Sequence, residues 1–219
     1  MTLGSLSSLA GLLKKASLAG AFFVPAIWLS AVQAQALCPA PQPLSYAQVE
    51  RVVDGDTLRL KDGRSVRMIG LNAPETGKKG QSAEPFADAA RKRLQTLVAL
   101  SDGRVGLLPG KQAKDRYGRT LAYVFRADSS NLEEQLLADG LAYQVAIAPN
   151  VELVGCQQAA ERRARTNGVG LWRQSPVVSA HNISRSGFAV VGGKVSQVQR
   201  NRGGLWIDLQ GGLVVHIAP

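Results

Sequence analysis

Apolar and polar residues alternate in short stretches between residues 47 and 125, and an alternation of period two is typical of half-buried β-strands. Five stretches show the pattern, at residues 49–53, 57–60, 65–69, 104–108 and 120–125. Asp54-Gly55 and Asp62-Gly63 separate the first three, and Asp-Gly favours a hairpin turn. The pattern therefore predicts a meander of antiparallel strands followed by two further strands.

Three other segments are predicted to be helices, and the first of them repeats its apolar residues at helical spacing. The first extends from about residue 84 to residue 100, and its apolar face consists of Phe86, Ala90, Leu94, Leu97 and Val98. The second covers residues 132–138, between an N-cap at Asn131 and a stop at Gly140. The third covers roughly residues 151–166 and ends at Asn167-Gly168.

Five strands with interspersed helices match the partly open Greek-key barrel called the OB-fold. We therefore predict an α+β, mainly β chain whose domain over residues 47–172 is a five-stranded OB-fold barrel with three helices. A proline-rich arm precedes this domain at residues 37–46. A linker over residues 173–187 follows it, and then a short basic β-rich tail at residues 188–219, which would either grip nucleic acid or form a structural or partner-docking flap.

The first 36 residues have the pattern of a signal peptide. Lys14 and Lys15 precede an apolar run at residues 16–29, and Ala34 and Ala36 supply the small residues that signal peptidase reads. The alternative is an uncleaved anchor, but the run is shorter than the roughly 20 residues that span a bilayer and Pro25 interrupts it. We expect a signal peptide over residues 1–36, no stable membrane anchor after its removal, and a periplasmic or secreted protein.

The net charge, the cysteines and the histidines limit which partners and which catalytic residues the chain can use. The chain has a formal net charge of +10, with 26 Lys and Arg against 16 Asp and Glu. Such an excess favours a polyanionic partner, although solubility alone would also account for it. Both cysteines, Cys38 and Cys156, lie beyond the leader, so export predicts a disulfide between them. The two histidines, His181 and His216, both lie in the C-terminal segment, which leaves catalysis to carboxylates and arginines.

Candidate metal ligands occur in two short stretches. Hydrolysis of a phosphodiester requires an activated water and positive charge near the phosphate oxygens, and a divalent cation supplies both. Asp56 is the first candidate ligand, since calcium prefers hard oxygen donors. Asn72 could add its side-chain oxygen and Ala73 its backbone carbonyl. Asp54-Gly55-Asp56 taken alone is more often an ordinary hairpin turn.

The remaining candidates would act on water and phosphate. Glu75 follows Pro74, whose fixed φ stiffens the loop, and is the candidate general base. Arg67 and Arg119 each present a guanidinium fork that matches two phosphate oxygens. In the basic loop before Arg119 we expect substrate contacts from Lys114, Arg116 and Tyr117, although a loop tyrosine is as often a structural lid.

In this order and spacing, residues 54–57, Arg67, residues 72–76 and residues 115–119 resemble the staphylococcal-type, calcium-dependent nucleases (the thermonuclease family). The resemblance extends from about Gln48 to Trp172 and implies the same OB-fold. It implies that Asp56 binds one Ca²⁺, that Glu75 activates water, and that Arg67 and Arg119 bind and stabilise the phosphate. Asp54 resembles a carboxylate that lies beside that site. The family cuts DNA and RNA with little sequence preference and leaves 3′-phosphates.

Two departures from the family pattern affect these expectations. Asn72 stands where well-studied members have an aspartate, so we expect calcium to bind more weakly. Ala146 and Ala148 stand where an aromatic pair is expected, and the lost base stacking should weaken the grip on substrate unless Tyr143 or the tail replaces it. These changes keep an alternative open, a catalytically weak or silent nucleic-acid-binding OB-fold protein. A wall- or partner-docking protein would rest on the tail, and no protein partner follows from the sequence.

Overall fold

The computed structural model describes residues 38–40, 43–77, 80, 82–184 and 186–219. The expected signal peptide at residues 1–36 lies outside the described residues, as does part of the expected N-terminal arm. Within the described ranges, no helix is long and apolar enough to cross a membrane.

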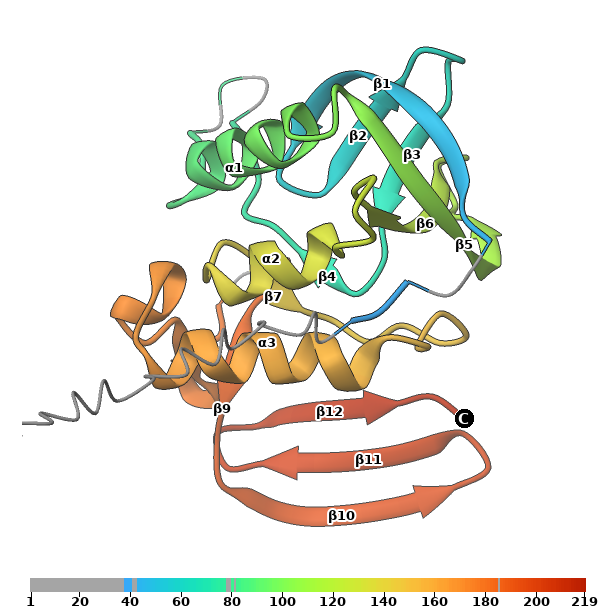
Figure 1. Cartoon of the computed structure of the whole chain (residues 1–219). Helices are drawn as coiled ribbons and strands as arrows, with labels where there is room; N and C mark the ends of the chain where they lie inside the picture. The colour runs from blue at the N-terminus through green and yellow to red at the C-terminus, as the bar shows by residue number, and fades with distance from the viewer. Residues whose placement is uncertain (1–37, 41–42, 78–79, 81, 185) are drawn as a thin grey trace, which may run out of the picture. The chain divides into compact units, whose positions relative to one another are not determined.

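A closed five-stranded barrel forms the centre of the fold (Figure 1). Its strands, in spatial order, are β1 (Ser45–Asp54), β2 (Thr57–Leu60), β3 (Ser65–Met68), β6 (Thr120–Phe125) and β5 (Arg104–Lys114). The pair β3–β6 is parallel and every other pair in the barrel is antiparallel. The five-stranded barrel predicted from the sequence is confirmed.

Two strands are longer than the alternation predicts. Strand β1 begins at Ser45 rather than Val49, because residues 45–48 pair with residues 104–107 of β5. Strand β5 continues to Lys114, beyond the predicted end at residue 108, so the basic loop before Arg119 is short. A further two-residue strand, β4 (Leu71–Asn72), pairs with β7 (Tyr143–Gln144) outside the barrel.

Three helices follow the predicted order: α1 (Ala87–Ala99), α2 (Leu132–Ala138) and α3 (Val154–Thr166). Helix α1 packs on β1, α2 packs on β6, and α3 lies beside α2 (Figure 1). Helix α2 starts as expected, since the Asn131 side chain accepts a hydrogen bond from the Glu134 backbone N–H. Helix α1 starts later, because Phe86 has a left-handed backbone with φ 68°. Phe86 is 38% exposed, so its predicted place on the buried face of the helix is wrong.

The core fills the barrel and the faces of α1 and α2 that lie against it. Alternation in β3 places Val66 and Met68 in this core and leaves Arg67 half-buried on the opposite face, as expected. The largest fully buried side chains are Tyr123, Phe125, Met68 and nine leucines, at positions 58, 60, 71, 94, 97, 107, 132, 136 and 137.

The C-terminal segment is more ordered than the predicted linker. Residues 173–187 contain the short strand β8 (Val177–Ser179), which pairs in parallel with β9 (Val190–Gly192), and the 3₁₀ helix η2 (Ala180–Asn182). Another 3₁₀ helix, η1 (Gly170–Arg173), precedes them.

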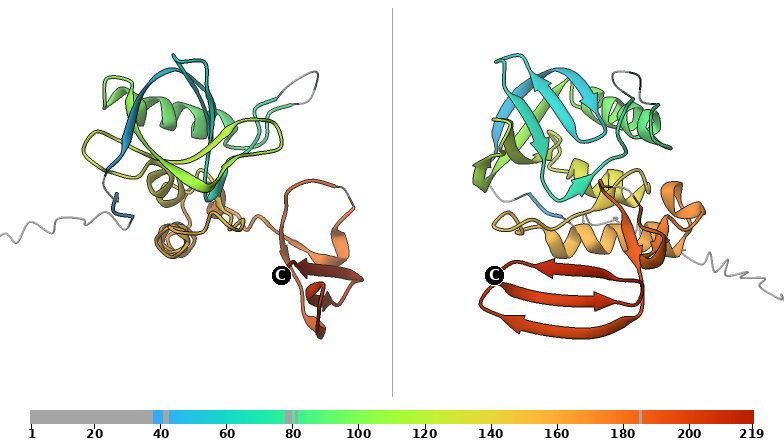
Figure 2. Two further views of the ribbon diagram at one scale, coloured as in Figure 1. Left: turned by 90° about the vertical axis from the view of Figure 1, so that its right-hand side faces the viewer. Right: turned by 180° about the vertical axis from the view of Figure 1, so that it is seen from behind.

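A separate antiparallel sheet follows (Figure 2). Its strands are β10 (Val195–Asn201), β11 (Gly204–Leu209) and β12 (Leu213–Ile217). None of the residues in these three strands is buried.

Candidate active site

The corner between β1 and β2 brings two carboxylates against the loop that follows β4. Asp54 ends β1 and pairs with Thr57, which begins β2. A Cβ atom at Gly55 would lie 2.6 Å from the Cβ of Ala73 and 2.7 Å from the Cβ of Ala90 in α1. Only glycine therefore fits at this corner, and the close approach holds Asp56 beside Ala73.

The Asp56 carboxylate is buried and fully engaged by its neighbours. Its Oδ2 accepts a hydrogen bond from the Ala73 backbone N–H at 3.0 Å and lies 3.0 Å from Nη2 of Arg67. Its Oδ1 accepts from the Thr57 hydroxyl at 2.9 Å, and the Asp56 backbone N–H donates to Oδ1 of Asp54 at 3.2 Å. Thr57 belongs to the motif at residues 54–57, but the sequence analysis gave its hydroxyl no role at the Asp56 carboxylate.

Arg67 is held in one orientation before any substrate arrives. Nη1 donates to the backbone carbonyls of Met68 (2.9 Å) and Leu71 (3.0 Å), and Nη2 donates to Oδ1 of Asn72 at 3.0 Å. Its side chain is only 16% exposed. Since Nη2 is 3.0 Å from both Asp56 Oδ2 and Asn72 Oδ1, the structure brings together three of the predicted site residues around one guanidinium.

Burial raises the pKa of Asp56 to about 6; the Arg67 guanidinium opposes this rise, and the Asp54 carboxylate adds to it. A buried carboxylate with a second carboxylate beside it gains from a nearby cation. The candidate metal ligands at this corner are the side-chain oxygens of Asp54, Asp56 and Asn72. Oxygen ligands fit a hard ion such as calcium.

In the described part of the chain, no three His, Cys, Asp or Glu residues cluster closely enough to hold a metal ion. An ion held here would therefore also require neutral oxygen ligands, such as the predicted Asn72 amide and Ala73 carbonyl, together with water.

Glu75 lies on an exposed loop that is fixed at its backbone. Its N–H donates to Oε2 of Glu84 at 2.8 Å, and its carbonyl accepts from the Glu84 N–H at 3.0 Å. These two hydrogen bonds tie the predicted general base to the residues just before α1. Nothing in the sequence pattern singles out Glu84 for this role.

The turn at residues 115–119 orients the second predicted arginine. Asp115 accepts a hydrogen bond from Arg119 Nε at 2.6 Å, and its other oxygen accepts from the backbone N–H groups of Tyr117 and Arg119 at 2.9 Å. Tyr117 is 68% exposed, with the guanidinium groups of Arg116 and Arg119 at 4.8 and 5.6 Å from its ring centroid. A single short turn thus gathers three of the predicted substrate-contacting residues.

One cavity of about 500 Å³ is lined by both predicted phosphate-binding arginines, together with Arg116 and Tyr117. The parallel pairing of β3 with β6 causes this convergence, because it sets Arg67 opposite Leu121, two residues after Arg119. Lys114 lines a neighbouring cavity of about 460 Å³ that also includes Arg59 and Arg64. Asp56 and Glu75 are not among the residues that line the larger cavity.

Comparison with known proteins decides the family. The family model described as staphylococcal nuclease homologue matches residues 65–174. The thermonuclease of Staphylococcus intermedius is 36% identical over 129 residues, which cover 58% of this chain and 75% of that protein. The chain belongs to the staphylococcal nuclease family.

Two further relatives agree. The thermonuclease of Staphylococcus hyicus is 37% identical over 128 residues, which cover 57% of this chain and 74% of that protein. Endonuclease YncB of Bacillus subtilis is 32% identical over 136 residues, which cover 60% of this chain and 63% of that protein. The match to the staphylococcal nuclease family model begins at β3 and therefore includes Arg67, Asn72, Glu75 and Arg119. The β1–β2 corner comes before the matched region.

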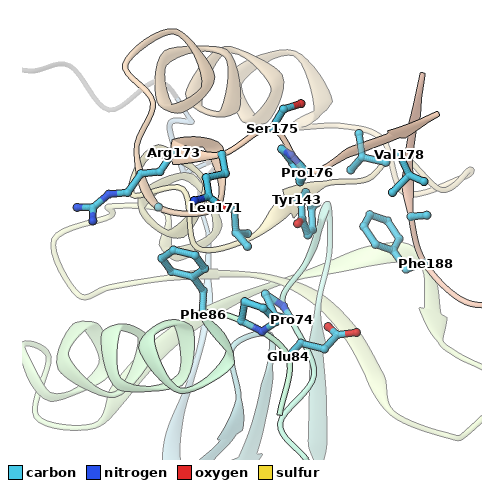
Figure 3. Close-up of a pocket in the computed structure, with 15 residues that line it drawn as sticks. Pro74, Glu84, Phe86, Tyr143, Leu171, Arg173, Ser175, Pro176, Val178 and Phe188 are labelled. Carbon is cyan, nitrogen blue, oxygen red and sulfur yellow. The ribbon is translucent and has the colours of Figure 1, made fainter. Parts of the chain in front are cut away.

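Tyr143 does not replace the aromatic residues expected in the arginine cavity of this family member. Ala148 lines that cavity, whereas Tyr143 lines a different one of about 580 Å³, with Pro74 and Phe86 (Figure 3). There its ring packs against Trp172 at 5.7 Å and Phe188 at 5.1 Å between centroids. The arginine cavity thus keeps Arg67 and Arg119 and has Ala148 at one of the two positions where an aromatic residue was expected.

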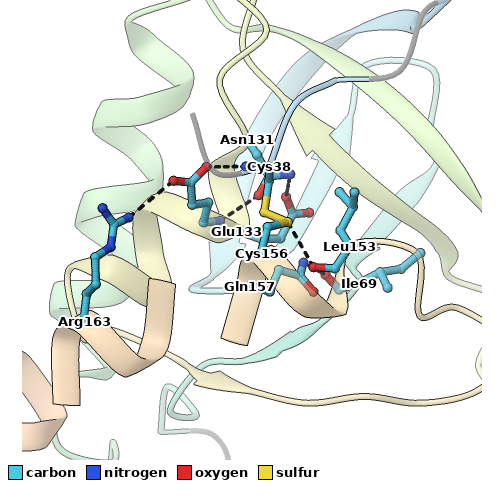
Figure 4. The surroundings of a disulfide bond; sticks show 9 residues. Cys38, Ile69, Asn131, Glu133, Leu153, Cys156, Gln157 and Arg163 are labelled. Carbon is cyan, nitrogen blue, oxygen red and sulfur yellow. Dashed lines mark hydrogen bonds and ion pairs between the residues drawn. A yellow bond between two sulfur atoms is a disulfide. The ribbon is translucent and has the colours of Figure 1, made fainter. Parts of the chain in front are cut away.

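The structure contains the disulfide that the sequence predicts. Cys38 and Cys156 are joined with an S–S distance of 2.07 Å across 118 positions of sequence (Figure 4). The Cys38 backbone N–H donates to Oε2 of Glu134, and Oε1 of Glu134 lies 3.6 Å from Nη2 of Arg163. The bond therefore attaches the start of the described chain to α3, next to the N-terminus of α2.

Proposed function

We propose that the protein is an exported, calcium-dependent, sugar-nonspecific nuclease that hydrolyses phosphodiester bonds in DNA and RNA and leaves 3′-phosphates. The observation that carries the proposal is the placement of Arg67. In a member of the staphylococcal nuclease family, this arginine is fixed between Asp56 and Asn72 and lines the same cavity as Arg119.

Arg67 and Arg119 bind the phosphate and stabilise the charge that builds up in the transition state. The carbonyls of Met68 and Leu71 hold the Arg67 guanidinium, and Asp115 holds Arg119 through Nε. Donors that are fixed in advance need no reorganisation when the charge develops, which makes them more effective than mobile ones. The exposed Tyr117 and Arg116, beside Arg119, extend the contact to the neighbouring sugar and phosphate.

Asp56, Asn72 and Ala73 would hold the calcium ion, and Asp54 would lie beside it. When bound, such an ion neutralises charge on the phosphate and makes a nearby water more acidic. Glu75 takes a proton from the attacking water, whose oxygen forms the new bond to phosphorus. The bond from phosphorus to the 5′ oxygen breaks, that oxygen gains a proton, and the phosphate stays on the 3′ side.

Export is supported by two features of the chain. The pattern of residues 1–36 predicts a signal peptide, and the Cys38–Cys156 disulfide suits an oxidising compartment such as the periplasm or the extracellular space. The net positive charge favours DNA and RNA as partners.

A cleavage assay with a Glu75→Gln control tests the proposal. The purified protein is incubated with single- and double-stranded DNA and with RNA, across a calcium titration and with chelator. We expect calcium-dependent cleavage, and in Glu75→Gln a loss of turnover of about 10²–10⁴-fold, since the loss of a general base costs about that much. DNA affinity should stay close to that of the wild type, and an unchanged rate would contradict the role of Glu75.

The second candidate function is nucleic-acid binding with little or no turnover. The contacts of Arg67 favour this function, since Nη2 lies 3.0 Å from both Asp56 Oδ2 and Asn72 Oδ1. These are two of the oxygens expected to bind the metal. Binding of nucleic acid without cleavage under any divalent ion would select this function.

A further inference from the structure

The cavity of about 580 Å³ that Tyr143 lines adjoins Pro74, the residue before Glu75 (Figure 3). Pro74, the residue before Glu75, lines one side, and Glu84, which holds the Glu75 backbone, lies beside it. The opposite side comes from the C-terminal segment after η1, with Pro176 and Phe188. The described residues after Trp172 therefore complete a cavity that borders the proposed catalytic loop.

Aromatic rings from three separate parts of the chain surround this cavity. Tyr143 and Phe188 pack against each other at 5.1 Å with their planes tilted by 39°, and Phe188 is 52% exposed. Phe86 lines another side and is 38% exposed. Burial raises the pKa of Tyr143, and Glu84 and Glu161 raise it further, so the phenol stays neutral.

The backbone at Phe86 adds an independent observation. Phe86 has φ 68°, a left-handed conformation that is costly for a bulky side chain and persists only where the surroundings impose it. Its carbonyl accepts a hydrogen bond from the Ala90 N–H at 2.9 Å, within the first turn of α1. The strained residue is therefore fixed at the helix start, with its large apolar ring at the cavity rather than in the core.

We infer that this cavity binds one unpaired nucleobase of the nucleic-acid substrate, stacked against Phe188 and Phe86 and next to the bond that is cut. The inference rests on the proposed function. Bases stack on aromatic rings whatever their sequence, and the cavity has the size of a small-ligand site. Arg173 lies at its edge, where a cation can meet the phosphate of the same nucleotide (Figure 3).

The position of the cavity explains why a base would be held there. Pro74 and Glu84 adjoin Glu75, so a nucleotide bound here is the neighbour of the phosphate that Glu75 serves. The arginine cavity has Ala148 where the family pattern has an aromatic residue. The arginine cavity lacks an aromatic stacking surface at Ala148. The C-terminal segment would thus provide a stacking surface on the other side of the catalytic loop.

Binding of two matched oligonucleotides tests the inference. In chelator, which prevents cleavage, fluorescence anisotropy gives the Kd for a single-stranded DNA and for an abasic strand of equal length. Phe188→Ala should weaken binding of the base-containing strand by roughly 5- to 100-fold, the range expected for one lost base–aromatic stack. Binding of the abasic strand should not change, because its phosphates are intact.

Two further variants make the result specific. Ile217→Ala removes a side chain that is also 52% exposed and lies in β12, away from the residues that line the cavity; it should bind both strands as the wild type does. Phe86→Gly removes the second ring and keeps a residue that readily adopts positive φ. It should show the same selective loss as Phe188→Ala.

The outcomes separate this inference from the proposed function. Equal loss on both strands, no loss on either, or no binding of the base-containing strand by the wild type would overturn the base-binding site. Absence of cleavage with any divalent ion would overturn the nuclease proposal, even where the base-dependent binding persists. Cleavage by a Phe188→Ala protein whose Kd is that of the wild type would overturn the base-binding site alone.

Discussion

Residue 72 shows how a single side chain changes the electrostatics of the site. The Asn72 side chain is uncharged, and its Oδ1 accepts a hydrogen bond from Arg67 Nη2 at 3.0 Å. Two side chains contact Nη2 of Arg67, and only Asp56 carries a negative charge that balances the guanidinium. A cation added at this corner must compete with Arg67 for the same oxygens.

Asn72→Asp should tighten calcium binding. A carboxylate adds a negative charge and a second oxygen to the ligand set, and calcium affinity rises with the number of charged ligands. We expect the calcium Kd to fall by about tenfold, a change of about 1.4 kcal/mol, measured by isothermal titration calorimetry. Asn182→Asp makes the same charge change at an exposed position in η2 and should have no effect. An unchanged Kd in Asn72→Asp would mean that residue 72 does not reach the ion.

At the scale of elements, the site depends on the close packing of the β1–β2 corner on α1. Gly55→Ala would place a methyl group 2.6 Å from the Ala73 Cβ and 2.7 Å from the Ala90 Cβ. Neither methyl can rotate away, so α1 or the loop after β4 must shift. We expect a loss of about 1–3 kcal/mol in the free energy of unfolding, as for other overpacked sites, measured by urea denaturation.

Gly155→Ala is the matched control. Gly155 lies in α3, and a Cβ there would meet no atom within 4 Å. Alanine is the better helix former by about 1 kcal/mol, so this variant should be as stable as the wild type or more stable. Equal stability of the Gly55→Ala and Gly155→Ala proteins would show that the corner can adjust without cost.

Local patterns predicted the elements whose ends are set by their own residues. The bounds of β2, β6 and α2 agree with the sequence prediction, since turns or an N-cap stand beside each. The extra length of β1 and β5 could not be predicted, because it depends on pairing between residues 45–48 and residues 104–107. The parallel partner of β8 was missed for the same reason.

In the candidate site, too, local motifs predicted some features, and others depend on contacts between distant parts of the chain. Asp54, Asp56 and Asn72 were predicted from short motifs, and the fold brings Asp56 and Asn72 to one guanidinium. The hydrogen bonds between Glu84 and the Glu75 backbone could not be predicted, since the two residues are nine positions apart and no sequence motif links them. The cavity at Phe188 depends on contacts across 45 positions, from Tyr143, which no local pattern encodes.

At the scale of the whole molecule, one covalent bond spans most of the domain. The Cys38–Cys156 disulfide closes a loop over 118 positions and ties the chain before the barrel to α3. Replacing both cysteines with alanine should lower the free energy of unfolding by about 2–5 kcal/mol, since the cross-link restricts the unfolded chain. Urea denaturation of the variant measures this loss.

Reductant provides the control for this prediction. Adding dithiothreitol should lower the unfolding midpoint of the wild type and leave that of the double variant unchanged. A double variant as stable as the oxidised wild type would show that the non-covalent contacts near Cys38, such as its hydrogen bond to Glu134, are sufficient.

The parallel pairing of β3 with β6 also bears on when the site forms during folding. Asp56, Arg67 and Glu75 all come before residue 76 in the sequence, whereas Arg119 stands directly before β6, and the pairing of residues 66–68 with residues 120–122 brings Arg67 and Arg119 to one cavity. A chain still being translated, with β6 inside the ribosome, has the proposed general base but does not yet have the second proposed phosphate-binding arginine beside the first. Under the proposed function, a nascent chain in which β6 has not yet paired with β3 should therefore not cleave RNA, and activity should appear only once that pairing completes the barrel.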